Sequence, residues 1–133
     1  MRGILKSSLE KYRESLGPPV IDGERHIQHQ QASLDGGNKM FASWKPGYLY
    51  LTATRLLFYQ GSNKLLELPT ASIRGVGIVE GRWVSKKTCP QLAVRRATAR
   101  GESIIHLRVD DLEAWRDRLQ ALIELDDFAV RDA

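Results

Sequence analysis

The sequence predicts a mainly β domain, an antiparallel barrel or sandwich that is closed by a single C-terminal helix. Short runs in which apolar and polar residues alternate follow one another closely from residue 24 to residue 109, with glycine-containing turns between them. That spacing is typical of antiparallel all-β architectures. The apolar period then changes from two residues to that of a helix over residues 111–125.

Length and composition agree with one globular domain. A chain of 133 residues buries about two-thirds of its unfolded surface, so it needs neither disulfides nor a metal to hold a core. Cys89 is the only cysteine and has no internal partner, which fits a reducing compartment. The net charge of +4 permits attraction to an anionic membrane surface or to nucleic acid without requiring either.

No apolar run approaches the roughly 20 residues that span a bilayer. Lys6, Glu10 and Lys11 interrupt the N-terminal segment, so it lacks the apolar core of a signal peptide. We therefore expect a soluble, cytoplasmic protein that could associate with a membrane only peripherally.

The N-terminal segment predicts an amphipathic helix over residues 2–16, which the Gly17-Pro18-Pro19 tripeptide ends. Its apolar residues share one stripe: Leu5, Leu9, Tyr12 and Leu16. Its polar face mixes both signs of charge, which favours docking on the domain or self-association over membrane contact. The predicted organisation is a helix and linker over residues 1–19, the domain over residues 20–127, and a tail over residues 128–133.

The predicted strands begin at residue 24. Ile27 and Leu34 have opposite parity within the first strand, over residues 24–34, so a bulge is expected near residues 28–31. A turn is expected after this strand. A short apolar-rich stretch follows over residues 39–44, and Lys45-Pro46-Gly47 is expected to separate it from the next strand. Further strands are predicted over residues 48–52, 55–60, 64–68, 73–80, 91–98 and 103–109.

The C-terminal helix is predicted to plug the open end of the barrel. Asp110 can cap it and Glu113 can return the capping bond. Its apolar residues fall at helical spacing, with Trp115 as the largest anchor: Leu112, Trp115, Leu119, Leu122 and Ile123.

The stretch 47–58, Gly-Tyr-Leu-Tyr-Leu-Thr-Ala-Thr-Arg-Leu-Leu-Phe, resembles the hallmark strand pair of GRAM domains. Leu68-Pro69, followed by Ile73 and Val76, resembles the next part of that pattern. GRAM domains belong to the pleckstrin-homology superfold, whose final helix also carries a tryptophan. The resemblance implies a strongly bent sheet of about seven strands with a C-terminal helix. It also implies binding to lipid headgroups or proteins, without catalysis.

No pattern in the chain points to catalysis, to a metal or to a cofactor. His26 and His29 face opposite sides of a regular strand, and Cys89 has no second cysteine to complete a zinc site. No nucleotide-binding or nucleophile motif is present either. We therefore expect a protein that is not an enzyme.

Two groups are candidates for binding. The first is the loop group Lys39, Met40, Phe41, Trp44 and Lys45, whose apolar side chains could enter a membrane interface while the lysines meet anionic headgroups. The alternative is that this stretch pairs back on residues 32–34 and buries its aromatic rings.

The second candidate is a basic group that surrounds Trp83: Arg82, Lys86, Lys87, Arg95, Arg96 and Arg100. We expect the sheet to bring Lys86 and Lys87 close to Arg95 and Arg96, so that the group could bind phosphate in a lipid or in nucleic acid. The alternative is that these are solvated charges that protect a sheet edge.

The preferred function is therefore non-catalytic, peripheral association with anionic lipid. The runner-up is a protein-binding adaptor that uses a sheet edge or the groove beside the C-terminal helix. Nucleic-acid binding is the third and least favoured hypothesis, because no RNA-binding signature is present.

Overall fold

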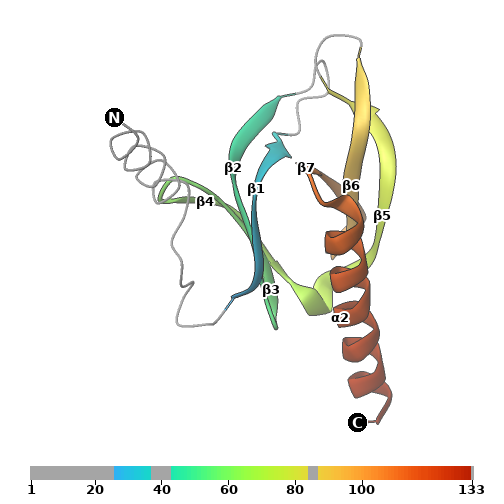
Figure 1. Cartoon of the computed structure of the whole chain (residues 1–133). Coiled ribbons are helices and arrows are strands. Elements are labelled where there is room, and N and C mark those ends of the chain that lie inside the picture. Colours follow the sequence, from blue (N-terminus) through green and yellow to red (C-terminus); the bar gives the residue numbers. More distant parts are fainter. Residues whose placement is uncertain (1–25, 37–42, 84–86, 133) are drawn as a thin grey trace.

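The structure, a computed structural model, describes residues 26–36, 43–83 and 87–132, without the side chains of His26 and residues 126–132. The described chain forms one seven-stranded antiparallel sheet in the order β4-β3-β2-β1-β7-β6-β5, followed by one helix. Figure 1 shows how the sheet bends around the space that the helix closes. The elements are β1 (His26–Asp35), β2 (Trp44–Thr52), β3 (Arg55–Gln60), β4 (Asn63–Pro69), η1 (Thr70–Ser72), β5 (Ile73–Arg82), β6 (Thr88–Thr98), β7 (Gly101–Val109) and α2 (Leu112–Asp132). The predicted mainly β fold is confirmed, whereas the predicted N-terminal helix lies outside the described residues.

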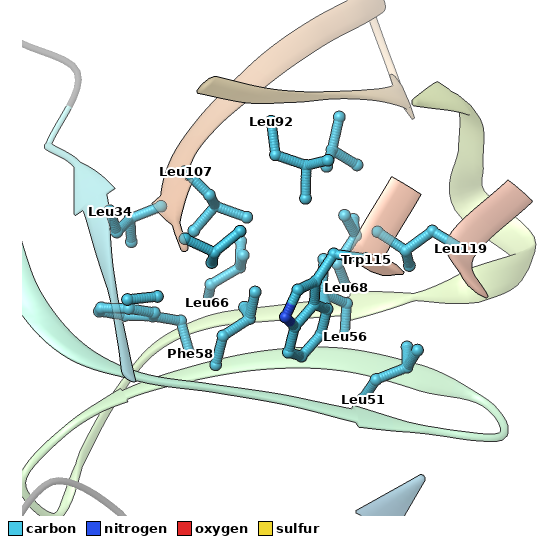
Figure 2. Packing of buried hydrophobic residues seen from close by; sticks show 14 of the residues in the cluster. Leu34, Leu51, Leu56, Phe58, Leu66, Leu68, Leu92, Leu107, Trp115 and Leu119 are labelled. Carbon is cyan, nitrogen blue, oxygen red and sulfur yellow. The ribbon is translucent and has the colours of Figure 1, made fainter. Parts of the chain in front are cut away.

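The core lies between the inner face of the bent sheet and α2 (Figure 2). Alternate residues of the strands point into it, as period-two patterning requires. They include Leu49, Leu51, Leu56, Phe58, Leu92, Val94 and Leu107, all fully buried. Trp115 of α2 is also fully buried, and its Nε1 donates a hydrogen bond to Oε1 of Gln30 on β1 at 2.7 Å. The predicted role of Trp115 as the anchor of the helix is confirmed.

The expected irregularity of the first strand is present, but it lies earlier than predicted. The register between β1 and β2 shifts between His26 and Gln28, so Ile27 is the inserted residue. Ile27 is 40% exposed, whereas Ala32 and Leu34 point into the core. The bulge therefore does not bring Ile27 into the core beside Ala32 and Leu34.

The expected interruption at Lys45-Pro46-Gly47 is wrong, because β2 runs through all three residues. The ladder to β3 ends at Tyr48, so the missing N–H of Pro46 interrupts no pairing with β3. Gly47 is needed for a different reason. A Cβ at this position would lie 2.2 Å from the carbonyl oxygen of Tyr59 and 2.7 Å from the Phe58 ring. The Pro-Gly pair here marks a close approach of two strands instead of a turn.

The helix begins at Leu112, and the carbonyl oxygen of Asp111 accepts the first intrahelical bond, from the Trp115 N–H, at 3.2 Å. Asp111 therefore takes the capping position that was predicted for Asp110. The helix also continues to Asp132, past the predicted end at residue 125 and into the predicted tail. The apolar stripe ends at Ile123, while Leu125 is 63% exposed. No glycine or proline follows in the sequence to stop the helix, so its backbone continues past the predicted end.

A second cluster of side chains lies on the opposite, outer face of the sheet, where β1, β2 and β3 meet; three of its members are buried, Tyr48 is half-buried and His29 is exposed. We call it the tyrosine face: His29, Tyr48, Tyr50, Leu57 and Tyr59. Tyr50 lies 6.0 Å from the rings of both His29 and Tyr59, measured between ring centroids. Leu57 is fully buried, and Tyr50 and Tyr59 are 3% and 7% exposed. β2 and β3 therefore bury side chains on both faces.

Burial, with smaller contributions from Tyr48 and Tyr59, raises the pKa of Tyr50 from 10.0 to about 12. The unfolded chain therefore loses this proton at lower pH than the folded one, and stability falls as pH rises from about 10 to about 12. We expect Tyr50→Phe to remove this part of the alkaline loss, as measured by urea unfolding at a series of pH values. An unchanged alkaline profile in Tyr50→Phe would contradict the assignment.

Candidate functional site

Two tryptophans join the ends of two hairpins. Trp44 begins β2, and Trp83 directly follows β5. The Trp44 Nε1 donates to the carbonyl oxygen of Trp83 at 3.0 Å, and the ring centroids are 5.2 Å apart. A ring pair at this distance stabilises by about 0.5–1.5 kcal/mol beyond the area that it buries. The β1–β2 and β5–β6 hairpin ends are therefore held against each other.

Each of the two hairpin ends is also closed by a backbone hydrogen bond. The Gly36 N–H donates to the Ser43 carbonyl oxygen at 2.6 Å, and the Trp83 N–H donates to the Lys87 carbonyl oxygen at 2.9 Å. These bonds close the β1–β2 and β5–β6 hairpins next to Trp44 and at Trp83, so the backbone at both tryptophans is hydrogen-bonded into the ends of the sheet.

Arg108 completes the group from a third strand, β7. Its guanidinium carbon lies 4.6 Å from the centroid of the Trp83 ring, within cation–π range. Stacking holds the guanidinium beside the ring while its N–H groups remain able to donate to an anion. The side chain of Arg108 is exposed.

Lys45 and Lys87 lie at the same two hairpin ends, and both are exposed. Among the described residues, neither forms an ion pair, and neither does Arg108. We call this group the tryptophan site: Trp44, Lys45, Trp83, Lys87 and Arg108. It combines two half-buried indole rings with three cations, an arrangement suited to a phosphate-bearing ligand at an interface between water and lipid.

The structure places the first predicted group only in part. Lys39, Met40 and Phe41 lie outside the described residues, so their role stays a prediction. Trp44 is half-buried and does not belong to the core, while Lys45 is exposed. Both pair with β1, Trp44 opposite Asp35 and Lys45 opposite Leu34, so the described end of this stretch joins the hairpin, but the residues opposite 32–34 are 45–47 and not 39–44.

The second predicted group does not come together as expected. Lys86 lies outside the described residues, and Arg82 and Lys87 flank the β5–β6 loop. Arg95 and Arg96 lie near the other end of β6, and the eight residues from Thr88 to Arg95 span seven steps, or about 23 Å. Lys87 thus adjoins the strand that holds Arg95 and Arg96 but lies at its opposite end, because β6 is one continuous strand, longer than the predicted one.

Arg95 and Arg96 have local partners at that far end. The Arg95 side chain covers Gly75 and lies 3.6 Å from a carboxylate oxygen of Glu102. The Arg96 Nε donates to the Ser103 Oγ at 2.9 Å. The described contacts of both arginines are thus with neighbouring strands.

The residues that were considered for catalysis or metal binding are scattered. His29 belongs to the tyrosine face, His106 is on β7, and Cys89 is buried in β6 beside Gln91. Within residues 26–36, 43–83 and 87–132, no group of three or more His, Cys, Asp or Glu residues could hold a metal ion.

Sequence reasoning missed Arg108. The signal was present in the alternation of β7, since Ile105, Leu107 and Val109 point inward and Arg108 must point outward. The pattern could not show that Trp83, which follows β5, contacts Arg108 on β7. That contact depends on how far the sheet bends.

Comparison with known proteins identifies the fold. No protein-family model and no curated protein matches the sequence significantly. Among solved structures, the Slm1 PH domain in complex with phosphoserine aligns with a TM-score of 0.56 at 16% identity, over 74% of this chain and 96% of that one. The same domain with inositol-4-phosphate aligns with a TM-score of 0.53 at 17% identity, over 73% and 96%. The chain therefore has a pleckstrin-homology-like fold, while membership of the GRAM family stays a prediction.

The described helix is not a membrane span. Over the part of the chain that the structure describes, no helix is both long and apolar enough to cross a bilayer.

Proposed function

We propose that this protein is a non-catalytic binding module that associates peripherally with anionic lipid through the tryptophan site. The supporting observation is the Arg108 guanidinium stacked on one of two paired tryptophans at adjoining hairpin ends, with Lys45 and Lys87 in the same two hairpins. Tryptophan side chains favour the boundary between headgroups and acyl chains, and cationic side chains favour an anionic surface. A part of Lys39, Met40, Phe41 and Lys86 in the same binding stays a prediction from the sequence.

The similarity to solved structures supports a ligand of this chemistry. The Slm1 PH domain was solved with phosphoserine and with inositol-4-phosphate, which both carry a phosphate monoester. The shared ligand chemistry proposed for this chain is thus a phosphate-bearing headgroup. Arg108 would donate to the phosphate from its stacked position, while Lys45 and Lys87 would attract the surrounding negative charge.

Co-sedimentation with vesicles tests the proposal. The full chain should bind phosphatidylcholine vesicles that contain phosphatidylserine or a phosphatidylinositol phosphate, and should not bind phosphatidylcholine alone. At about 1 kcal/mol per lysine, Lys45→Ala with Lys87→Ala should weaken binding roughly 30-fold at low salt. The loss should shrink at high salt, where screening has already reduced the lysine contribution.

The matched control is Arg95→Ala with Arg100→Ala, which removes the same charge from the far end of β6. If both pairs weaken binding equally, net charge and not the tryptophan site is responsible. Soluble inositol phosphate supplies a further arm, because binding to it without binding to vesicles would indicate a free phosphate ligand. If neither vesicles nor soluble inositol phosphate bind, the proposal fails.

Protein binding is the second candidate, and a separate surface favours it. On the outer face of β5 and β7, Val79 is 39% and Ile104 is 55% exposed, and a Cβ built on the neighbouring Gly77 would meet nothing within 4 Å. With Ala93 and Arg95 of β6, which line the same shallow pocket, they form a partly apolar strip that suits a protein partner. Vesicle binding that survives Ile104→Glu would separate this strip from the lipid site.

A further inference from the structure

The tyrosine face requires a cover that the described residues do not supply. Leu57 and Tyr50 point away from the core, on the side of the sheet opposite Leu56 and Leu49. A side chain on the outer face of a sheet reaches zero exposure only when other atoms lie over it. The rings of Tyr48 and Tyr59 lie beside Tyr50 on the same face, so they cannot form a second layer.

The described helix does not provide that layer. α2 packs mainly against β5, with smaller contacts to β6 and η1. Its Trp115 and Leu119 are members of the core cluster on the inner face. No described helix therefore forms a layer over Leu57 and Tyr50; Glu67, the β4 partner of Leu57, is engaged with Arg55 in an ion pair.

Of the undescribed segments, residues 1–25 are the one whose connection to the described chain lies nearest to this part of the sheet. Residues 1–25 join β1 at His26, which pairs with Thr52, two residues from Tyr50. Residues 37–42 leave the hairpin at its other end, where Trp44 is six residues from Tyr50, or about 20 Å along the strand. Residues 84–86 follow β5, at the far edge of the sheet.

The dimensions of the N-terminal segment match the face. The predicted helix of residues 2–16 is about 22 Å long. The four strands β1–β4 together span about 14 Å between their outer axes. The intervening residues 17–25 reach at most about 30 Å, which is enough for the helix to turn back over the sheet.

We propose that residues 2–16 form a helix that docks in cis on the tyrosine face, with Leu5, Leu9, Tyr12 and Leu16 against Tyr50, Leu57 and Tyr59. The apolar stripe of the segment supplies the buried layer that the face requires. The segment is then a structural layer of the domain and is not a membrane-surface or dimerisation helix. This inference is independent of the proposed lipid binding.

Paramagnetic relaxation in the full chain tests the placement. A nitroxide attached at Glu10→Cys, in a Cys89→Ser background, lies on the polar side of the stripe and leaves docking possible. It should broaden the backbone amide signals of Tyr50, Leu57 and Tyr59. A nitroxide at Arg100→Cys, in the β6–β7 turn, is the control and should leave those three signals sharp.

A mixed sample distinguishes docking in cis from pairing of two chains. Spin-labelled chains without nitrogen-15 are mixed with unlabelled, nitrogen-15-enriched chains, and the same amides should stay sharp. Broadening in the mixed sample would replace the cis proposal with exchange between copies. Sharp signals in both samples would overturn docking altogether.

Paired substitutions provide a second readout that does not depend on the label. Leu5→Ser with Leu9→Ser removes half of the stripe, whereas Lys6→Ser with Glu10→Ser changes the polar face and preserves the net charge. The first pair should shift the Tyr50 titration, followed by tyrosinate absorbance, from about 12 towards 10.0. The second pair should leave it in place. Equal titrations in the two variants would contradict the proposal.

Discussion

Trp115→Ala is expected to lower the free energy of unfolding by about 3–5 kcal/mol, the largest loss that a single substitution in this chain should produce. The Trp115 side chain is fully buried in the core between α2 and the sheet (Figure 2). Its removal leaves a large cavity and also leaves the Gln30 carboxamide without its 2.7 Å hydrogen bond. Urea titration monitored by circular dichroism measures the change, and an unchanged m-value confirms that stability alone has shifted.

Two controls divide this loss into its parts. Trp115→Phe keeps most of the apolar volume and removes the indole N–H, so its smaller loss reports the bond to Gln30. Arg118→Ala changes an exposed residue of the same helix and should stay within about 0.5 kcal/mol. A loss below about 1 kcal/mol in Trp115→Ala would show that α2 does not anchor the fold.

Gly47→Ala should destabilise the domain by about 1–3 kcal/mol through overpacking. The added Cβ would meet the Tyr59 carbonyl oxygen at 2.2 Å and the Phe58 ring at 2.7 Å. Backbone and core side chains would both have to move, because neither neighbour is the flexible end of a side chain. Thermal and urea unfolding of the variant measure the effect.

Gly77→Ala is the matched control, since it makes the same substitution in another strand, β5. Nothing lies within 4 Å of a Cβ at that position, and alanine restricts the unfolded chain more than glycine does. Its effect should be neutral or slightly stabilising. If the two variants unfold alike, the close approach at Gly47 does not determine the path of β2.

The amino-acid sequence by itself determined the class of fold and most of its elements. Alternation located the strands, because each strand has one face in the core and one outside it. Helical spacing around Trp115 identified α2 and its buried stripe for the same reason, since both patterns record which side chains leave water. The local signals misplaced the bulge of β1 and the ends of β6 and α2, and they failed at Gly47, whose role is its long-range contact with β3.

Only the tertiary structure decided which residues meet. It joined Trp44 to Trp83, added Arg108, and separated Arg95 and Arg96 from Lys87. It also revealed that Tyr50 and Leu57 are buried on the outer face of the sheet. These contacts join strands that are distant in sequence, and they depend on the bend of the sheet. The bend is the sum of twists along many residues, so no local pattern of the chain encodes it.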